Sequence, residues 1–162
     1  MSGIVAKKIN LTTAPTVSGT LYPLPFDQPC LKRARIKLGD AAGLTQFGVN
    51  LCTLPPGTWS SQRHWHTHED ELIYVVAGEV TLVTDDGEEV LHAGDSAGFK
   101  AGDKNGHTFQ NRSSADAVIL EIGTRIDEDA AYYSDIDLVS PAGPVNYTHR
   151  DGTPYPEQKR RS

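Results

Sequence analysis

The stretch His64-Trp65-His66-Thr67-His68-Glu69-Asp70-Glu71-Leu72-Ile73-Tyr74-Val75-Val76-Ala77-Gly78 joins a segment of histidines and acids to an apolar run. The apolar run predicts a strand, and side chains two positions apart on a strand lie on the same face. His64 and His66 can therefore direct two imidazole rings to one point while Trp65 faces the other way. Two histidines and a carboxylate such as Glu71 are typical ligands of a divalent metal ion.

Glu71 lies five positions after His66, so an unbroken strand would place the two side chains on opposite faces. We expect the chain to bend or bulge between Thr67 and Asp70, which lets the ligands converge. His66 and His68 form a second pair with the same spacing, which leaves His68 as an alternative to His64. Histidines hydrogen-bonded to polar neighbours at a strand end would be a simpler explanation. Three histidines within five residues, followed by three acids, count against it.

A second set of residues follows the first after a predicted hairpin: Gly94, the segment Lys100-Ala101-Gly102, His107 and Asn111. Together with Gly57, the His-x-His pair, the glutamate and Gly78, this set resembles the two sequence motifs of the cupin superfamily. The resemblance covers about residues 47–123. It implies that the metal ligands are His64, His66, Glu71 and His107.

The chain departs from the family pattern at three points. Lys100 stands where the pattern has a proline, four residues instead of two separate Gly102 from His107, and six instead of five separate Gly57 from His64. These differences predict altered loops around an intact site.

Short apolar runs punctuated by 15 glycines and 10 prolines predict an all-β fold. Alternating apolar residues predict a strand from Phe47 to Leu51, and residues 79–84 followed by Asp85-Asp86-Gly87 predict a hairpin. Residues 117–122 form a continuous apolar run typical of a buried strand. No long helical stripe is present. We predict a single-domain double-stranded β-helix, the jelly-roll barrel that the resemblance also implies.

The ends of the chain differ in composition from its middle. We expect an N-terminal arm over residues 1–30, a barrel over residues 31–125 and a C-terminal tail over residues 126–162, with residues 158–162 disordered. Basic and apolar residues alternate from Leu31 to Leu38, which predicts an edge strand protected by charge.

Composition excludes several classes of protein. The 162 residues carry a formal net charge of −6, which argues against general nucleic-acid binding. No run approaches the ~20 apolar residues that span a bilayer. Cys30 and Cys52 lack metal or redox spacing, and no secretory signal is apparent, so we expect reduced thiols and a cytoplasmic protein.

Trp65 suggests an oligomer. An indole that points away from the barrel needs a cover, and we expect a second subunit in a homodimer or, alternatively, the N-terminal arm of the same chain to provide it.

Three imidazoles and one carboxylate leave open positions on a five- or six-coordinate ion, which suits binding of substrate oxygens. The ligands accept manganese, iron, nickel, copper and zinc alike. Glu71 is the candidate base, provided that the metal does not engage it fully. Lys100, Lys104, Arg125 and Arg150 are candidates for a basic rim that binds an anionic substrate. Tyr147, His149 and Arg150 either close the barrel mouth or pack on the outer sheet.

The resemblance implies a small-molecule substrate, and we expect a metal-dependent isomerase or epimerase of a small sugar or sugar phosphate. An iron-dependent dioxygenase and a non-catalytic metabolite sensor are the alternatives. Fold alone does not separate the three.

Overall fold

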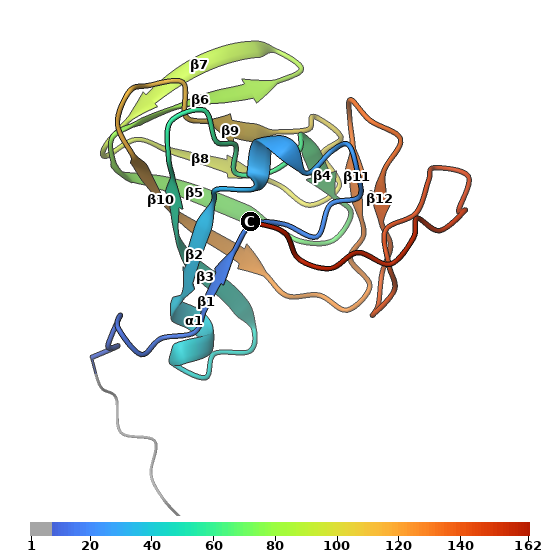
Figure 1. The fold of residues 1–162 in the computed structure, drawn as a ribbon, viewed down its shortest axis with the longest axis horizontal. Helices are drawn as coiled ribbons and strands as arrows, with labels where there is room; N and C mark the ends of the chain where they lie inside the picture. The colour runs from blue at the N-terminus through green and yellow to red at the C-terminus, as the bar shows by residue number, and fades with distance from the viewer. Residues whose placement is uncertain (1–7) are drawn as a thin grey trace, which may run out of the picture.

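Residues 8–162 are the part of the chain that the computed structural model describes, and nearly all of their regular structure is β-strand (Figure 1). The strands are β1 (Thr16–Ser18), β2 (Ala34–Lys37), β3 (Phe47–Leu54), β4 (His64–His66), β5 (Glu71–Ala77), β6 (Glu79–Thr84), β7 (Gly87–His92), β8 (Ser96–Phe99), β9 (Thr108–Gln110), β10 (Ala117–Thr124), β11 (Ala131–Tyr133) and β12 (Val139–Ser140). A 3-10 turn (Gln28–Cys30) and the short helix α1 (Leu38–Ala41) complete the elements.

Two antiparallel sheets enclose the main core. The larger has the strand order β1-β2-β3-β10-β5-β8, and the smaller has the order β7-β6-β9. Inward side chains of both sheets meet in one apolar cluster, which includes Leu54, Val75, Val80, Phe109 and Ile119. These residues occupy alternate positions on their strands, so the period-2 pattern of the sequence places them on the buried face. The all-β barrel prediction is confirmed.

The β6–β7 hairpin turns at Asp85-Asp86, as the sequence predicts. The turn between β5 and β6 is as tight, because Gly78 adopts a φ of +73° that favours glycine. A Cβ atom at Gly78 would lie 2.6 Å from the carbonyl oxygen of Asp116. Gly78 thus joins β5 of the larger sheet directly to β6 of the smaller one.

The C-terminal segment contributes to a third sheet, with the order β12-β11-β4. β11 pairs with the histidine-bearing strand, with Tyr132 opposite Trp65 and Tyr133 opposite His64. Tyr133 also packs in a second apolar cluster with Tyr22 from the N-terminal segment. Both ends of the chain therefore support β4.

The prediction that residues 158–162 are disordered is wrong. Arg161 pairs with Thr20 through two backbone hydrogen bonds of 2.8 and 3.0 Å. Its Nε atom lies 2.9 Å from a carboxylate oxygen of Asp27, which is 1% exposed. The backbone pairing and the ion pair hold the end of the chain against the N-terminal segment.

The prediction of a charged edge strand at residues 31–38 is also wrong. β2 lies between β1 and β3, so its backbone is paired on both sides. Arg33 and Arg35 face the interior instead of solvent, because Glu121 and backbone carbonyl oxygens accept their hydrogen bonds.

Trp65 obtains its cover from its own C-terminal segment. Its ring stacks on Tyr132 with centroids 5.1 Å apart, and Lys104 lies over it at 5.9 Å. Neither a second subunit nor the N-terminal arm is needed for this purpose, so the homodimer loses that support and stays a prediction.

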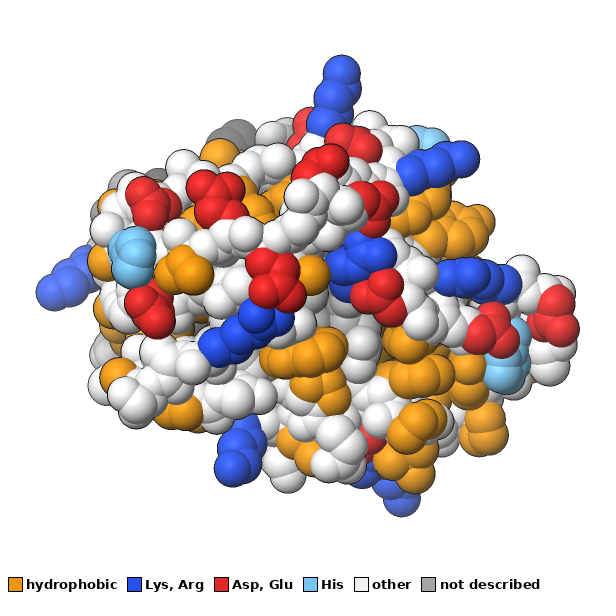
Figure 2. All heavy atoms as spheres, turned by 90° about the horizontal axis from the view of Figure 1, so that it is seen from above, with side chains coloured by type: hydrophobic (Ala, Val, Ile, Leu, Met, Phe, Trp, Pro, Cys, Tyr) orange, Lys and Arg blue, Asp and Glu red, His pale blue; other side chains and the backbone are white. Residues whose placement is uncertain are grey.

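Cys30 and Cys52 are both buried and unpaired with each other. Among residues 8–162, no helix has the length and apolar character needed to cross a lipid bilayer. On the face shown in Figure 2, acidic and basic side chains lie beside one another rather than in separate patches.

Candidate metal centre

Three parts of the chain bring the four predicted ligands together. His64 and His66 share one face of β4, Glu71 begins β5, and His107 precedes β9. His107 is fixed beside His64 by two backbone hydrogen bonds of 2.9 and 3.1 Å. The chain bends at residues 67–70, between β4 and β5, as the parity argument predicts.

The ring nitrogens of the three histidines surround one carboxylate oxygen. Glu71 Oε2 lies 2.9 Å from His107 Nε2, 3.4 Å from His66 Nε2 and 3.8 Å from His64 Nε2. The ligand atoms of His64, His66 and Glu71 all lie within 4.8 Å of one another. His68 is exposed and its Nδ1 contacts Thr67 Oγ1 at 2.8 Å, so it lies outside this cluster.

A divalent cation fits this cluster. Glu71 Oε2 is buried and has no assigned hydrogen-bond partner, and the nearest ring nitrogen, His107 Nε2, lies 2.9 Å from it. A buried carboxylate oxygen without a partner is costly. Three imidazole nitrogens and one carboxylate around the same point form a donor set that offsets this cost when a cation is bound.

The protonation states of the cluster also suit metal binding. Burial lowers the pKa of His64 to about 4, so its imidazole is neutral at pH 7. Burial by itself would raise the pKa of Glu71, but the contact with His107 and the neighbouring His64 and His66 outweigh it and lower that pKa to about 2. Metal ligands must be deprotonated, and these two groups are.

Further contacts orient the imidazole rings. His64 Nδ1 lies 2.8 Å from the carbonyl oxygen of Gln62, and His66 Nδ1 lies 2.6 Å from a carboxylate oxygen of Asp129. Each contact leaves the Nε2 atom of its ring directed at the cluster. The His107 ring stacks on Phe99 with centroids 3.5 Å apart.

Asp129 also shapes the loop between the ligands. Its Oδ1 atom accepts hydrogen bonds from the backbone nitrogens of His68 and Glu69, at 2.8 and 3.2 Å. His66, Glu69 and Asp129 form a second group with the spacing of metal ligands. Because Asp129 contacts His66 directly at 2.6 Å, we interpret this group as one that orients the His66 ring and not as a second metal site.

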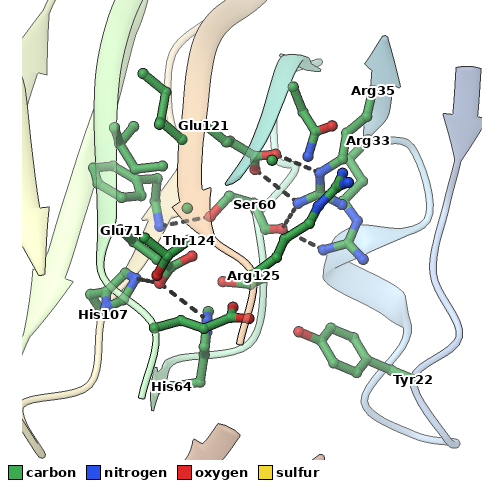
Figure 3. A pocket seen from close by; sticks show the side chains of 18 residues that line it. Tyr22, Arg33, Arg35, Ser60, His64, Glu71, His107, Glu121, Thr124 and Arg125 are labelled. Carbon is green, nitrogen blue, oxygen red and sulfur yellow. Dashed lines mark hydrogen bonds and ion pairs between the residues drawn. The ribbon is translucent and has the colours of Figure 1, made fainter. Parts of the chain in front are cut away.

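A cavity of about 390 Å³ opens in front of the cluster. His64, Glu71 and His107 lie at one end of it, whereas Arg33 and Arg35 lie at the other (Figure 3). A smaller cavity of about 160 Å³ on the other side of Glu71 is lined by Lys100 among others.

The predicted substrate-binding residues are divided between different places. Arg125 lines the larger cavity and Lys100 the smaller one. Tyr147 lies in the second apolar cluster, with its ring centroid 5.6 Å from that of Tyr22. His149 Nδ1 lies 2.8 Å from Asp137, and its ring stacks on Tyr155. Tyr147 and His149 line neither cavity.

Sequence reasoning missed Asp129, Arg33, Arg35 and Glu121. The acidic run at residues 127–129 and the basic alternation at residues 33–37 were visible signals. Neither signal indicates which residues face the cavity, because that depends on strand register.

Comparison with known proteins identifies the family. The Cupin domain family model matches residues 50–123. A Silicibacter pomeroyi protein, named as a sugar phosphate isomerase from a cupin superfamily, has 42% sequence identity and a TM-score of 0.85, over 93% of this chain and 97% of that one. The chain belongs to the cupin superfamily. No curated protein sequence matches this cupin.

Two further solved structures extend the comparison. A candidate sugar phosphate isomerase from Acidithiobacillus ferrooxidans has 25% identity to this cupin and a TM-score of 0.74, over 96% of this chain and 97% of that one. The polyketide cyclase RemF from Streptomyces resistomycificus has 19% identity and a TM-score of 0.58, over 74% and 80% of the two chains. The second likeness concerns the fold alone.

Proposed function

We propose that this cupin is a metal-dependent isomerase or epimerase of a small sugar or sugar phosphate. The observation that carries the proposal is the cluster of three histidines and Glu71 at one end of a cavity of about 390 Å³. The names of the Silicibacter pomeroyi and Acidithiobacillus ferrooxidans proteins support the choice of substrate class.

His64, His66, Glu71 and His107 would hold the divalent ion. When bound, such an ion supplies Lewis acidity, which stabilises negative charge on a substrate oxygen. The donor set accepts manganese, iron, nickel, copper or zinc, so metal availability decides which is used.

An isomerase removes a proton from the carbon beside a carbonyl group and returns a proton to the former carbonyl carbon, whereas an epimerase returns it to the same carbon. Glu71 Oε2 faces the ring nitrogens of three histidines, so as a metal ligand it would not be free to accept a proton. Glu69 lines the same cavity, and one of its oxygens accepts a hydrogen bond from the backbone of Ile126 at 2.9 Å. We therefore assign the proton transfer to Glu69 when Glu71 is engaged.

Other side chains of the cavity suit a hydroxyl-rich substrate. Asn50, Ser61 and Thr124 line it and offer donors and acceptors for hydroxyl groups. The cavity is large enough for a small sugar phosphate.

The proposal is tested by solvent proton exchange. Metal-loaded protein is incubated in D₂O with a panel of aldose and ketose phosphates and the corresponding free sugars, and deuterium incorporation is followed by NMR. We expect metal-dependent deuterium incorporation beside the carbonyl of at least one substrate, and its loss in the Glu69→Gln variant. Iron-dependent oxygen consumption without exchange would support the dioxygenase, and metabolite binding without turnover the sensor.

The ligand assignment has its own test. His107→Ala should reduce bound metal from stoichiometric to trace amounts while the protein stays folded, because it removes one of three imidazoles at Glu71 Oε2. His92→Ala is the matched control, since that side chain is 67% exposed and lies outside the cluster. Elemental analysis measures both variants. Stoichiometric metal in His107→Ala would show that the fourth ligand is misassigned.

We also propose a cytoplasmic location, supported by the two buried cysteines that form no disulfide.

A further inference from the structure

Arg33 is a buried cation at the end of the larger cavity that is remote from the metal ligands. It is 8% exposed and lines the cavity. Its Nε atom donates a hydrogen bond of 3.1 Å to the carbonyl oxygen of Gly19, and its terminal nitrogen donates to the carbonyl oxygen of Ser60. These carbonyl oxygens accept hydrogen bonds from Arg33, but they are uncharged and do not neutralise its positive charge.

Within residues 8–162, Arg33 has no carboxylate at ion-pair distance, in contrast to the neighbouring Arg35. Arg35 forms a two-pronged ion pair with Glu121, with nitrogen to oxygen distances of 2.6 and 2.8 Å. A buried charge without a counter-charge is unfavourable, so this position suits an anionic ligand.

The surroundings of Arg33 add positive charge. Arg160, from the C-terminal segment, donates to the same Gly19 carbonyl oxygen at 3.2 Å. Burial and the charges of Arg33 and Arg35 lower the pKa of Arg160, which reflects this crowding of cations. The nearby carboxylates already form other ion pairs, Glu121 with Arg35 and Asp27 with Arg161, and so do not neutralise Arg33.

The remaining acids that line the cavity, Glu69 and Glu71, belong to its opposite end, where the histidines lie. Figure 3 shows Arg33 and Arg35 across the cavity from Glu71 and His107. A ligand that spans the cavity therefore meets imidazoles at one end and guanidinium groups at the other.

We propose that Arg33 forms an anion site that takes the phosphate group of the substrate, so that this cupin acts on a phosphorylated sugar and not on a neutral one. The inference rests on the proposed function. A guanidinium group suits phosphate because its planar array of donors matches the phosphate oxygens. Carboxylate groups share part of this chemistry, and the experiment separates the two.

The test measures binding of inorganic phosphate to metal-free protein by isothermal titration calorimetry. We expect saturable binding at one site of the wild type and at least tenfold weaker binding in Arg33→Gln, which keeps a donor but removes the charge. Arg112→Gln is the matched control, because Arg112 pairs with Glu88 on the surface and lines neither cavity. It should bind phosphate as the wild type does.

Three results would overturn the inference: no saturable phosphate binding by the wild type, unchanged binding in Arg33→Gln, or equally tight binding of acetate. If Arg33→Gln does not fold, a crystal structure of the wild type with tungstate, a phosphate analogue, decides. The anion beside Arg33 supports the site, and an anion elsewhere contradicts it.

The outcome is separable from that of the isomerase proposal, since the titration uses neither metal nor turnover. Phosphate binding without isomerase activity would leave the anion site standing. Isomerisation of free sugars alone would contradict the anion site and leave the isomerase standing.

Discussion

Asp129 shows how one carboxylate can organise a cluster of candidate metal ligands from outside it. It contacts His66 Nδ1 at 2.6 Å and, through its other oxygen, holds the backbone of His68 and Glu69. The first contact sets the orientation of an imidazole, and the others set the path of the chain between His66 and Glu71. Positioning groups of this kind affect the affinity for metal although they do not touch the ion.

We expect Asp129→Ala to weaken metal binding by about 10- to 100-fold, because His66 loses its orienting acceptor. Asp129→Asn should recover part of the loss, since its amide oxygen still accepts a hydrogen bond. Competition titration with a chromophoric chelator measures both affinities. Asp127→Ala, at an exposed position in the same acidic run, is the control. An unchanged metal affinity in Asp129→Ala would remove Asp129 from the centre.

At the scale of elements, the tight β5–β6 turn depends on Gly78. Gly43 adopts nearly the same backbone conformation, with a φ of +71° compared with +73° for Gly78. A Cβ atom at Gly43 would meet nothing within 4 Å, whereas one at Gly78 would approach Asp116 and Ala117 to 2.6 and 3.0 Å. Alanine substitutions at the two positions therefore distinguish the cost of backbone strain, which both share, from the cost of steric overlap, which only Gly78 has.

Gly43→Ala should lower the free energy of unfolding by about 1–2 kcal/mol, the cost of a left-handed backbone for a residue with a Cβ atom. Gly78→Ala should lower it by at least twice as much, because the β5–β6 turn must also open. Urea denaturation followed by circular dichroism gives both values. Equal losses would mean that the contact with Asp116 relaxes without cost.

At the scale of the whole molecule, the two ends of the chain are tied together. Arg161 supplies the charge that faces Asp27, and Asp27 Oδ1 has no hydrogen-bond partner of its own. The segment around Asp27 also carries Tyr22, which packs against the tail that supports β4. The C-terminus thereby contributes to the stability of the ligand-bearing strand.

Arg161→Met should lower the free energy of unfolding by about 1–3 kcal/mol, because it leaves a buried carboxylate unpaired. Arg112→Met removes an exposed, solvent-screened ion pair with Glu88 and should change the free energy of unfolding much less than Arg161→Met does. Adding Asp27→Asn to Arg161→Met should restore part of the loss, as thermal and urea unfolding can measure. No recovery in the double variant would contradict the assigned role of the ion pair.

We propose that the protein forms a homodimer through the outer face of its larger sheet. Ile36, Leu51, Leu120 and Tyr74 form a row across four paired strands, and Tyr74 is 42% exposed. The row carries no charged side chain, so the same row of a second chain can pack on it about a two-fold axis without bringing like charges into contact.

Sedimentation equilibrium should give the wild type twice the 17.6 kDa mass of one chain. Tyr74→Lys should give a monomer, because two lysines would be brought face to face. Val90→Lys, at an exposed apolar position on the other sheet, should stay dimeric. A wild-type monomer, or a dimer that tolerates Tyr74→Lys, would rule out this interface.

The sequence by itself determined several of the strands, such as those at residues 47–51, 79–84 and 117–122, and the bend at residues 67–70. Together with the family resemblance it also indicated which residues gather as candidate metal ligands. Strand alternation and hairpin turns are local properties, so residues such as His64 and His66 reveal a shared face without tertiary information. The spacing of the two family motifs then indicated that Glu71 and His107 belong to the same set as His64 and His66.

Only the tertiary structure decided which polar residues meet across the cavity. The alternation at Arg33 and Arg35 is the same whether the arginines face solvent or the interior, and Glu121, 86 residues from Arg35, decides the matter. Asp129 meets His66 from 63 residues away. Such contacts depend on strand order and register between distant segments, and no local pattern encodes either.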